Sequence, residues 1–109
     1  MLEGLYKVKF RTGGDDGSCI CLFKGGRVTG GGSVMYYLGS YQFDGNHFTM
    51  ELEAKRHAKK SKPSPVLGLD EFHLTMEGIS SGAFAQAVGK ILEVPEAVFM
   101  ANFARLCDA

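Results

Sequence analysis

The sequence predicts an all-β fold, a small antiparallel up-and-down β-barrel of about eight strands. Apolar and polar residues alternate in segments such as 6–11 and 48–55, and a period of two is that of a strand with one buried face. The 15 glycines, against 3 prolines, often occur in clusters between such segments, which is typical of tight turns. An eight-strand meander can close on itself, and closure removes the exposed edges that an open sheet leaves.

The first half of the chain contains three short predicted strands. Segment 6–11 alternates apolar and basic side chains, so it is predicted to be a half-buried strand. The glycine-rich segment 13–17 predicts a turn. Segment 19–23 is continuously apolar and is interpreted as a strand covered on both faces. The Gly25-Gly26 pair supplies the positive φ angles of a tight hairpin, from which residues 27–29 return.

The middle of the chain predicts a long hairpin, a loop and a further strand. Segment 34–43 is rich in β-forming residues, and the following Asp-Gly-Asn at 44–46 is a strong hairpin signal. Segment 48–55 alternates cleanly. Segment 57–68 is basic, contains prolines and has no apolar periodicity, so it predicts an exposed loop within one domain. Alternation resumes at 72–77.

Residues 83–106 allow two interpretations. Phe84 and Val88 lie at helical spacing, and alanine, which is frequent here, is the best helix former. The alternative is a pair of strands, in which Phe99 and Ala101 share one face, although this alternation is weaker. Local evidence leaves both open. Strands are preferred because they complete an eight-strand barrel.

Length and composition restrict the class of protein. We expect one domain over residues 1–109, and 45% hydrophobic with 22% charged residues is globular rather than disordered. No segment is long and apolar enough to span a bilayer, and the first residues lack the pattern of a signal peptide. Cys19, Cys21 and Cys107 do not form a disulfide framework. Reduced thiols and a cytoplasmic location are therefore expected.

The sequence offers little support for catalysis, a metal or a cofactor. Segment 29–33 has neither the lysine nor the following helix of a phosphate-binding loop. Asp15 and Asp16 lie in a glycine-rich turn without the further acidic ligands that calcium needs. Cys19 and Cys21 would share a strand face, but a structural zinc site normally needs four ligands, so they are interpreted as small buried apolar residues. We expect a protein that is not an enzyme.

Charge and aromatic content leave binding functions open. Basic residues concentrate at 55–62, but 12 basic residues balance 12 acidic ones, so nucleic acid is not the expected partner. The aromatic residues either fill the barrel or line a cavity for one small apolar ligand, and surplus apolar side chains could form a two-fold dimer interface. The candidate interior ligand-binding residues are Phe10, Tyr37, Tyr41, Phe48 and Met50.

Three motifs resemble one known family. Gly4-Leu5-Tyr6, Val28-Thr29-Gly30-Gly31 and Tyr37-Leu38-Gly39-Ser40-Tyr41 are similar, in order and spacing, to the family typified by GrlR, a negative regulator of type III secretion genes in bacteria. The resemblance covers about residues 4–56 well, and residues 69–78 are similar to bacterial members of the wider group. It implies a lipocalin-like barrel with an apolar interior that forms a homodimer and binds a transcriptional activator through an acidic surface loop.

The chain departs from this pattern at the acidic loop. The corresponding position falls at residues 42–45, where only Asp44 is acidic, and Gly32 stands where the family usually has an aspartate. The resemblance still implies a non-enzymatic negative regulator that binds a transcriptional regulator through its surface, with Tyr41, Phe43 and Asp44 as candidate partner-binding residues. The alternative expectation is a carrier or sensor of a small apolar ligand held inside the barrel.

Overall fold

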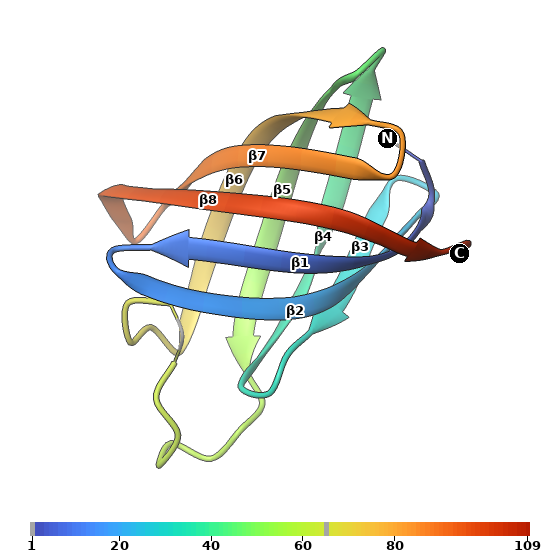
Figure 1. The fold of residues 1–109 in the computed structure, drawn as a ribbon. Coiled ribbons are helices and arrows are strands. Elements are labelled where there is room, and N and C mark those ends of the chain that lie inside the picture. The colour runs from blue at the N-terminus through green and yellow to red at the C-terminus, as the bar shows by residue number, and fades with distance from the viewer. Residues whose placement is uncertain (1, 65) are drawn as a thin grey trace.

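The chain folds as a closed barrel of eight antiparallel strands, which confirms the predicted fold class (Figure 1). The computed structural model describes residues 2–64 and 66–109, so Met1 and, within the predicted loop, Pro65 lie outside the described residues. Each strand pairs with the next along the chain, and β8 pairs with β1 to close the barrel. The strands are β1 (Gly4–Thr12), β2 (Asp15–Lys24), β3 (Arg27–Gly31), β4 (Met35–Asp44), β5 (His47–Arg56), β6 (Glu71–Ser81), β7 (Phe84–Ile91) and β8 (Val94–Cys107).

The C-terminal segment consists of strands, as preferred. The β8 strand pairs with β7 along one edge and with β1 along the other. These pairings give its backbone groups the hydrogen-bond partners that a helix would otherwise provide internally. Within the described part of the chain, no helix is long and apolar enough to cross a membrane.

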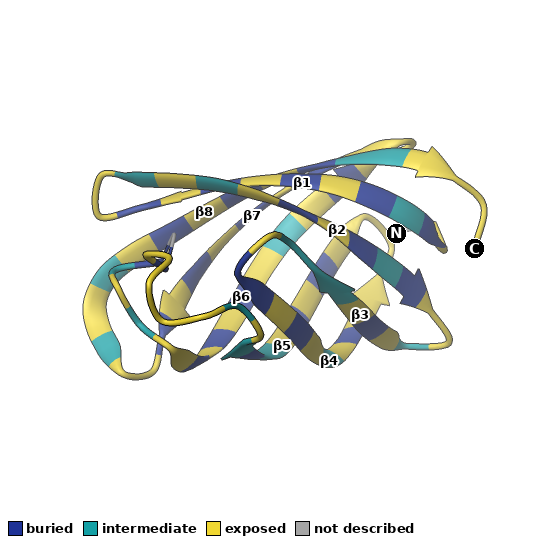
Figure 2. Cartoon of the chain, turned by 90° about the horizontal axis from the view of Figure 1, so that it is seen from below, coloured by how far each residue is buried: buried dark blue, intermediate teal, exposed yellow. Residues whose placement is uncertain are grey.

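The core lies inside the barrel, and alternate residues of every strand supply it (Figure 2). Cross-strand pairing keeps buried residues next to one another, as for Met50 opposite Met76 and Ala87 opposite Ala101. Large and small side chains from facing walls then share the limited interior. The fully buried large side chains include Tyr6, Phe23, Met35, Phe48, Met50 and Phe72.

The turns are as predicted at two hairpins and shorter than predicted at a third. Gly25 and Gly45 adopt φ angles of 61° and 62°, which suit the tight turns predicted there. At 13–17 only Gly13 and Gly14 form the turn, and β2 already begins at Asp15. The reason is that Thr12 pairs with Asp15 across this hairpin, so the ladder reaches the turn.

The second strand differs from the sequence interpretation. Segment 19–23 was expected to be covered on both faces, but Ile20 is 41% exposed and Leu22 is half-buried. A closed barrel has its core inside, so the outward side chains of β2 face solvent even when they are apolar. Cys19, Cys21 and Phe23 alone point inward and are buried.

The loop between β5 and β6 closes one end of the barrel rather than lying wholly exposed. Val66 is fully buried, and Leu67 and Leu69 pack against the core. The loop is tied to the barrel by the Leu67 amide, which donates to the Asp15 carboxylate at 3.0 Å. Only the lysine-bearing part extends away from the barrel, as the predicted exposed loop should (Figure 1).

Candidate binding surfaces

All five candidate ligand-binding residues point into the barrel, but the interior is almost full. Phe10, Tyr37, Tyr41, Phe48 and Met50 are at most 5% exposed. An interior void bordered by three of them, Phe10, Tyr37 and Met50, measures only about 20 Å³, which is close to the space of one water molecule. This packing matches a filled core rather than a cavity prepared for a ligand.

Aromatic rings occupy the interior at the end of the barrel opposite the loop. Phe23 meets the rings of Tyr6, Tyr41 and Phe103 edge to face, with centroid separations of 5.1, 5.2 and 5.9 Å, a geometry that aromatic quadrupoles favour. The Tyr6 hydroxyl donates to the Leu2 carbonyl at 2.6 Å. Burial raises the pKa of Tyr6 and of Tyr41 because it disfavours the phenolate. The two tyrosines at this end of the barrel are therefore neutral at ordinary pH, and their rings are packed.

The two strand cysteines form a contact inside the barrel. The Sγ atoms of Cys19 and Cys21 are 3.7 Å apart. This contact lowers the pKa of Cys19 and raises that of Cys21, where burial adds to the increase. Either sulfur can be the donor in this contact. Cys107, in contrast, is exposed.

The burial of the thiols predicts their reactivity. In native protein we expect an aromatic disulfide reagent to modify Cys107 within the mixing time and to leave Cys19 and Cys21 unmodified over minutes, because attack requires an accessible thiolate. After unfolding in guanidinium chloride, all three thiols should be accessible and should react. The absorbance of the aromatic thiolate that the reagent releases gives the number of reactive thiols in native and in unfolded protein. A Cys107→Ser variant is the matched control. Fast modification of two or more thiols in native protein would contradict the packed interior.

The three candidate partner-binding residues lie at and beside the β4–β5 hairpin but differ in accessibility. Tyr41 is buried, whereas Phe43 is 59% exposed. The two rings stack with a centroid separation of 6.4 Å and an interplanar angle of 20°. Asp44 is exposed, and its backbone lies opposite that of His47 in the β4–β5 hairpin. Tyr41 thus supports Phe43 from the interior, and the surface available to a partner consists of Phe43 and Asp44, the hairpin tip.

Lys55 and Arg56, in the basic segment 55–62, have ion-pair partners nearby, and Arg56 also organises the loop. The Arg56 guanidinium contacts Asp70 at 2.7 Å and donates to the carbonyls of Lys59 and Lys62. Lys55 pairs with Glu53 at 3.0 Å. Such internal partners reduce the charge available to a phosphate backbone, so this loop adds no support for nucleic acid.

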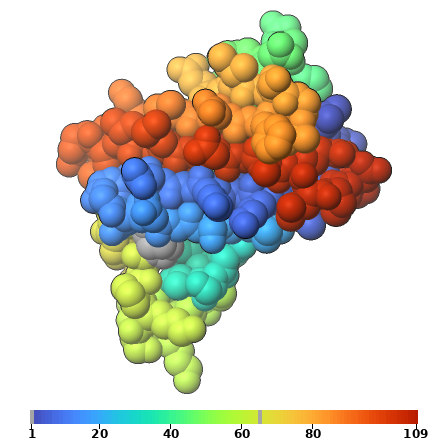
Figure 3. Space-filling model, viewed as in Figure 1, coloured from blue at the N-terminus to red at the C-terminus, as the bar shows by residue number. Residues whose placement is uncertain are grey.

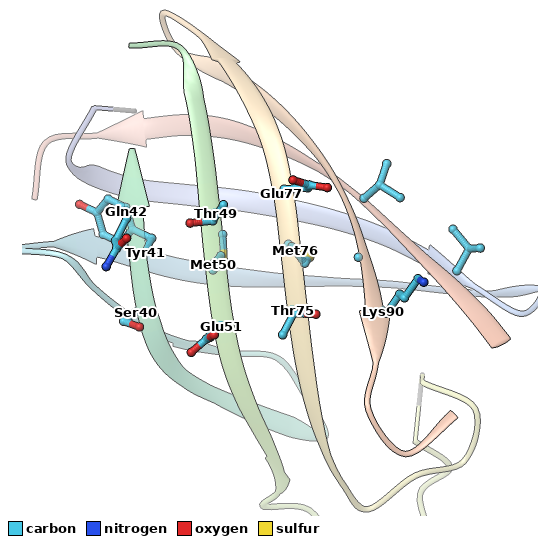
Figure 4. A pocket seen from close by; sticks show the side chains of 13 residues that line it. Ser40, Tyr41, Gln42, Thr49, Met50, Glu51, Thr75, Met76, Glu77 and Lys90 are labelled. Atoms are coloured by element: carbon cyan, nitrogen blue, oxygen red, sulfur yellow. The ribbon is translucent and has the colours of Figure 1, made fainter. Parts of the chain in front are cut away.

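A shallow groove of about 510 Å³ lies on the outer face of β4–β8 (Figure 4). Its lining includes the short side chains of Thr49 and Thr75 and the charged side chains of Glu51, Glu77 and Lys90. Within the part of the chain that the structure describes, no three His, Cys, Asp or Glu side chains are placed to hold a metal ion. The groove is mixed in charge and open to solvent, and it suits a partner surface better than a small substrate.

Exposed apolar side chains also lie on the outer faces of β6, β7 and β8, and two of them, Val88 and Val98, line this groove. We call this surface the apolar strip. Val88 lies directly opposite Met100, and Phe84 lies opposite Ala104. Clustered exposed apolar residues of this kind mark interaction surfaces, whereas single ones do not. The strip consists of Ile79, Phe84, Val88, Val98 and Met100, which are between 51% and 66% exposed.

Sequence reasoning missed the apolar strip, although a signal was present. The strand alternation at 98–104 is weak because outward positions such as Val98 and Met100 are apolar like their inward neighbours. On a strand with one solvated face, this pattern indicates that the second face is covered by something else.

The chain was also compared with known proteins. No protein-family model matches it, and no curated protein matches it.

Proposed function

We propose that this chain is a non-enzymatic regulatory protein that binds a transcriptional regulator through its surface and acts as a negative regulator. The observation that carries the proposal is the hairpin tip, where an exposed aromatic ring stacks on a second, buried ring. Phe43 stacks on Tyr41, and Asp44 stands beside it in the chain. Aromatic side chains at interfaces often contribute strongly to binding energy, and a ring that already has a stacking partner loses less side-chain entropy on binding.

The class of partner follows from the resemblance to the GrlR family, in which an acidic surface loop binds a transcriptional activator. Here the loop has one acid, Asp44, so the aromatic ring would have to supply most of the contact energy. The packed interior supports surface binding over the carrier alternative. A small apolar ligand would need a cavity of a few hundred Å³, and the barrel offers about 20 Å³.

A capture experiment followed by an affinity measurement tests the proposal. The tagged chain is used to capture proteins from a lysate of its source organism, and each captured protein is identified by mass spectrometry and purified. We expect a transcriptional regulator, bound about tenfold or more weakly by Phe43→Ala than by the unchanged chain, since an anchor residue costs at least about 1.4 kcal/mol when truncated. Isothermal titration calorimetry measures the two affinities.

The matched control is Leu38→Ala, which removes another exposed apolar side chain of the same strand, 42% exposed. It should leave the affinity unchanged. Equal loss in both variants would place the contact outside the hairpin tip. Capture of no transcriptional regulator would refute the regulatory function.

A further inference from the structure

Four sulfur-bearing side chains line the small void inside the barrel. Cys19 and Cys21 come from β2, Met50 from β5 and Met76 from β6. Met50 lies directly opposite Met76, and Figure 4 shows both on these neighbouring strands. The chain has 3 cysteines and 5 methionines, so half of its sulfur-bearing residues border one void of about 20 Å³.

The two thiols are already about as close as two ligands of one metal ion. Their Sγ atoms are 3.7 Å apart. With metal–thiolate bonds of about 2.3 Å, the length found for zinc, two sulfur ligands of one ion lie about 3.8 Å apart at a tetrahedral angle and about 4.6 Å apart in a straight line. The observed separation therefore suits an ion with further ligands, and the two methionines are there to supply them.

Two glycines leave space beside these side chains. Gly30 lies opposite Cys21 in the β2–β3 pair, and a Cβ atom at Gly30 would lie 2.8 Å from Cys21 Sγ. Gly89 lies opposite Met76, and a Cβ atom there would lie 2.5 Å from Met76 Cγ. Both side chains therefore occupy space that a larger residue on the neighbouring strand would take.

We propose that these four side chains form a binding site for one Cu(I) ion inside the barrel. Thiolate and thioether sulfurs are soft ligands, which favour Cu(I), zinc and iron–sulfur clusters. Zinc takes Cys, His, Asp and Glu ligands, and among the described residues no three such side chains are placed to share an ion. An iron–sulfur cluster is held by four cysteines, whereas this chain has three. Cu(I) is the one of these groups that two thiols and two thioethers suit.

The size and enclosure of the void restrict what enters it and when. A single water needs about 10–15 Å³, so a void of about 20 Å³ admits one ion and no organic ligand. Cys19 and Cys21 are buried, and side chains of β1, β7 and β8 form a continuous surface over the barrel (Figure 3). The ion therefore enters while the chain folds. Its binding releases thiol protons as thiolates form, and no electron is transferred.

The test uses the purified chain alone, so its outcome is independent of the regulatory proposal. A Cys107→Ser background removes the exposed thiol. The chain is refolded under argon with Cu(I), supplied as its acetonitrile complex, and is then titrated with a chromophoric Cu(I) chelator. We expect one Cu(I) per chain, and X-ray absorption at the copper edge should show sulfur neighbours only.

Substitutions in the same background separate the ligands from the rest of the core. Cys19→Ala should abolish Cu(I) binding. Met50→Leu keeps the side-chain volume nearly constant, so the fold should be retained, and it should lower the affinity by about tenfold or more, the least that loss of a group supporting a metal site costs. Met35→Leu is the matched control, because Met35 is as buried as Met50 but lies outside the set that lines the void.

Circular dichroism of each variant checks that the fold is retained. A refolded chain that binds no Cu(I) would overturn the proposal, and so would oxygen or nitrogen neighbours at the copper edge. Unchanged affinity in a folded Cys19→Ala variant would place the ion elsewhere. Equal affinities of Met50→Leu and Met35→Leu would exclude Met50 as a ligand, whatever the behaviour of the cysteine variant.

Discussion

Phe23→Ala is expected to lower the free energy of unfolding by about 3–5 kcal/mol, the range for removing a fully buried phenylalanine. Phe23 has no exposed surface, and its ring contacts those of Tyr6, Tyr41 and Phe103. The three rings belong to β1, β4 and β8, so the variant would leave a cavity between walls that cannot easily collapse. A native stability of about 5–15 kcal/mol would fall by a large fraction. Urea denaturation followed by circular dichroism measures the change.

The matched control for this prediction is Phe43→Ala, because it removes the same side chain from an exposed position. Its free energy of unfolding should change by less than about 0.5–1 kcal/mol. Both variants should be compared at one protein concentration, since self-association adds to apparent stability. Equal effects of the two substitutions would contradict the packing described for the aromatic end of the barrel.

Gly39→Ala is expected to destabilise the protein by about 1–3 kcal/mol through overpacking, although alanine is usually preferred to glycine in a strand. A Cβ atom at this position would lie 2.8 Å from a methyl group of Leu52 and against the backbone oxygen of Glu51. The neighbouring strand β5 would have to move away, because the obstructing oxygen belongs to its backbone. The same denaturation experiment measures the effect.

Ser40→Ala is the control for this second variant, since residue 40 is the next position of β4 and points outward. Its expected change is within about 0.5 kcal/mol. A Gly39→Ala variant that is as stable as the unchanged chain would show that β4 and β5 approach each other less closely than in this structure.

Local alternation was sufficient to predict some strands and insufficient for others. Segments 6–11 and 48–55 alternate because their outward faces are charged, so the two-residue period is visible in the residue types themselves. At 84–106 the outward face carries Val88, Val98 and Met100, and the contrast between the two faces disappears. The choice between strand and helix then depended on closure of the barrel, which is a property of the whole chain.

The candidate site was predicted in part. The sequence indicated that Tyr41, Phe43 and Asp44 lie together near a hairpin, because the Asp-Gly turn is a local signal. It could not indicate that Tyr41 would be buried and Phe43 exposed. Both residues occupy positions of β4 that alternate toward the barrel interior. They differ in exposure because Phe43 lies nearer the end of the barrel than Tyr41 does.

By itself, the sequence determined strands such as 6–11 and 48–55 and the glycine turns at Gly25 and Gly45, because hydrophobic period and turn chemistry are encoded within a few residues. Only the tertiary structure decided how full the barrel is, how the loop closes one end and which apolar side chains remain outside. Those outcomes depend on which strand lies beside which, and the pairing of β8 with β1 joins residues about a hundred positions apart. No local pattern contains that information, because interior volume and cross-strand rows exist only once the barrel has closed.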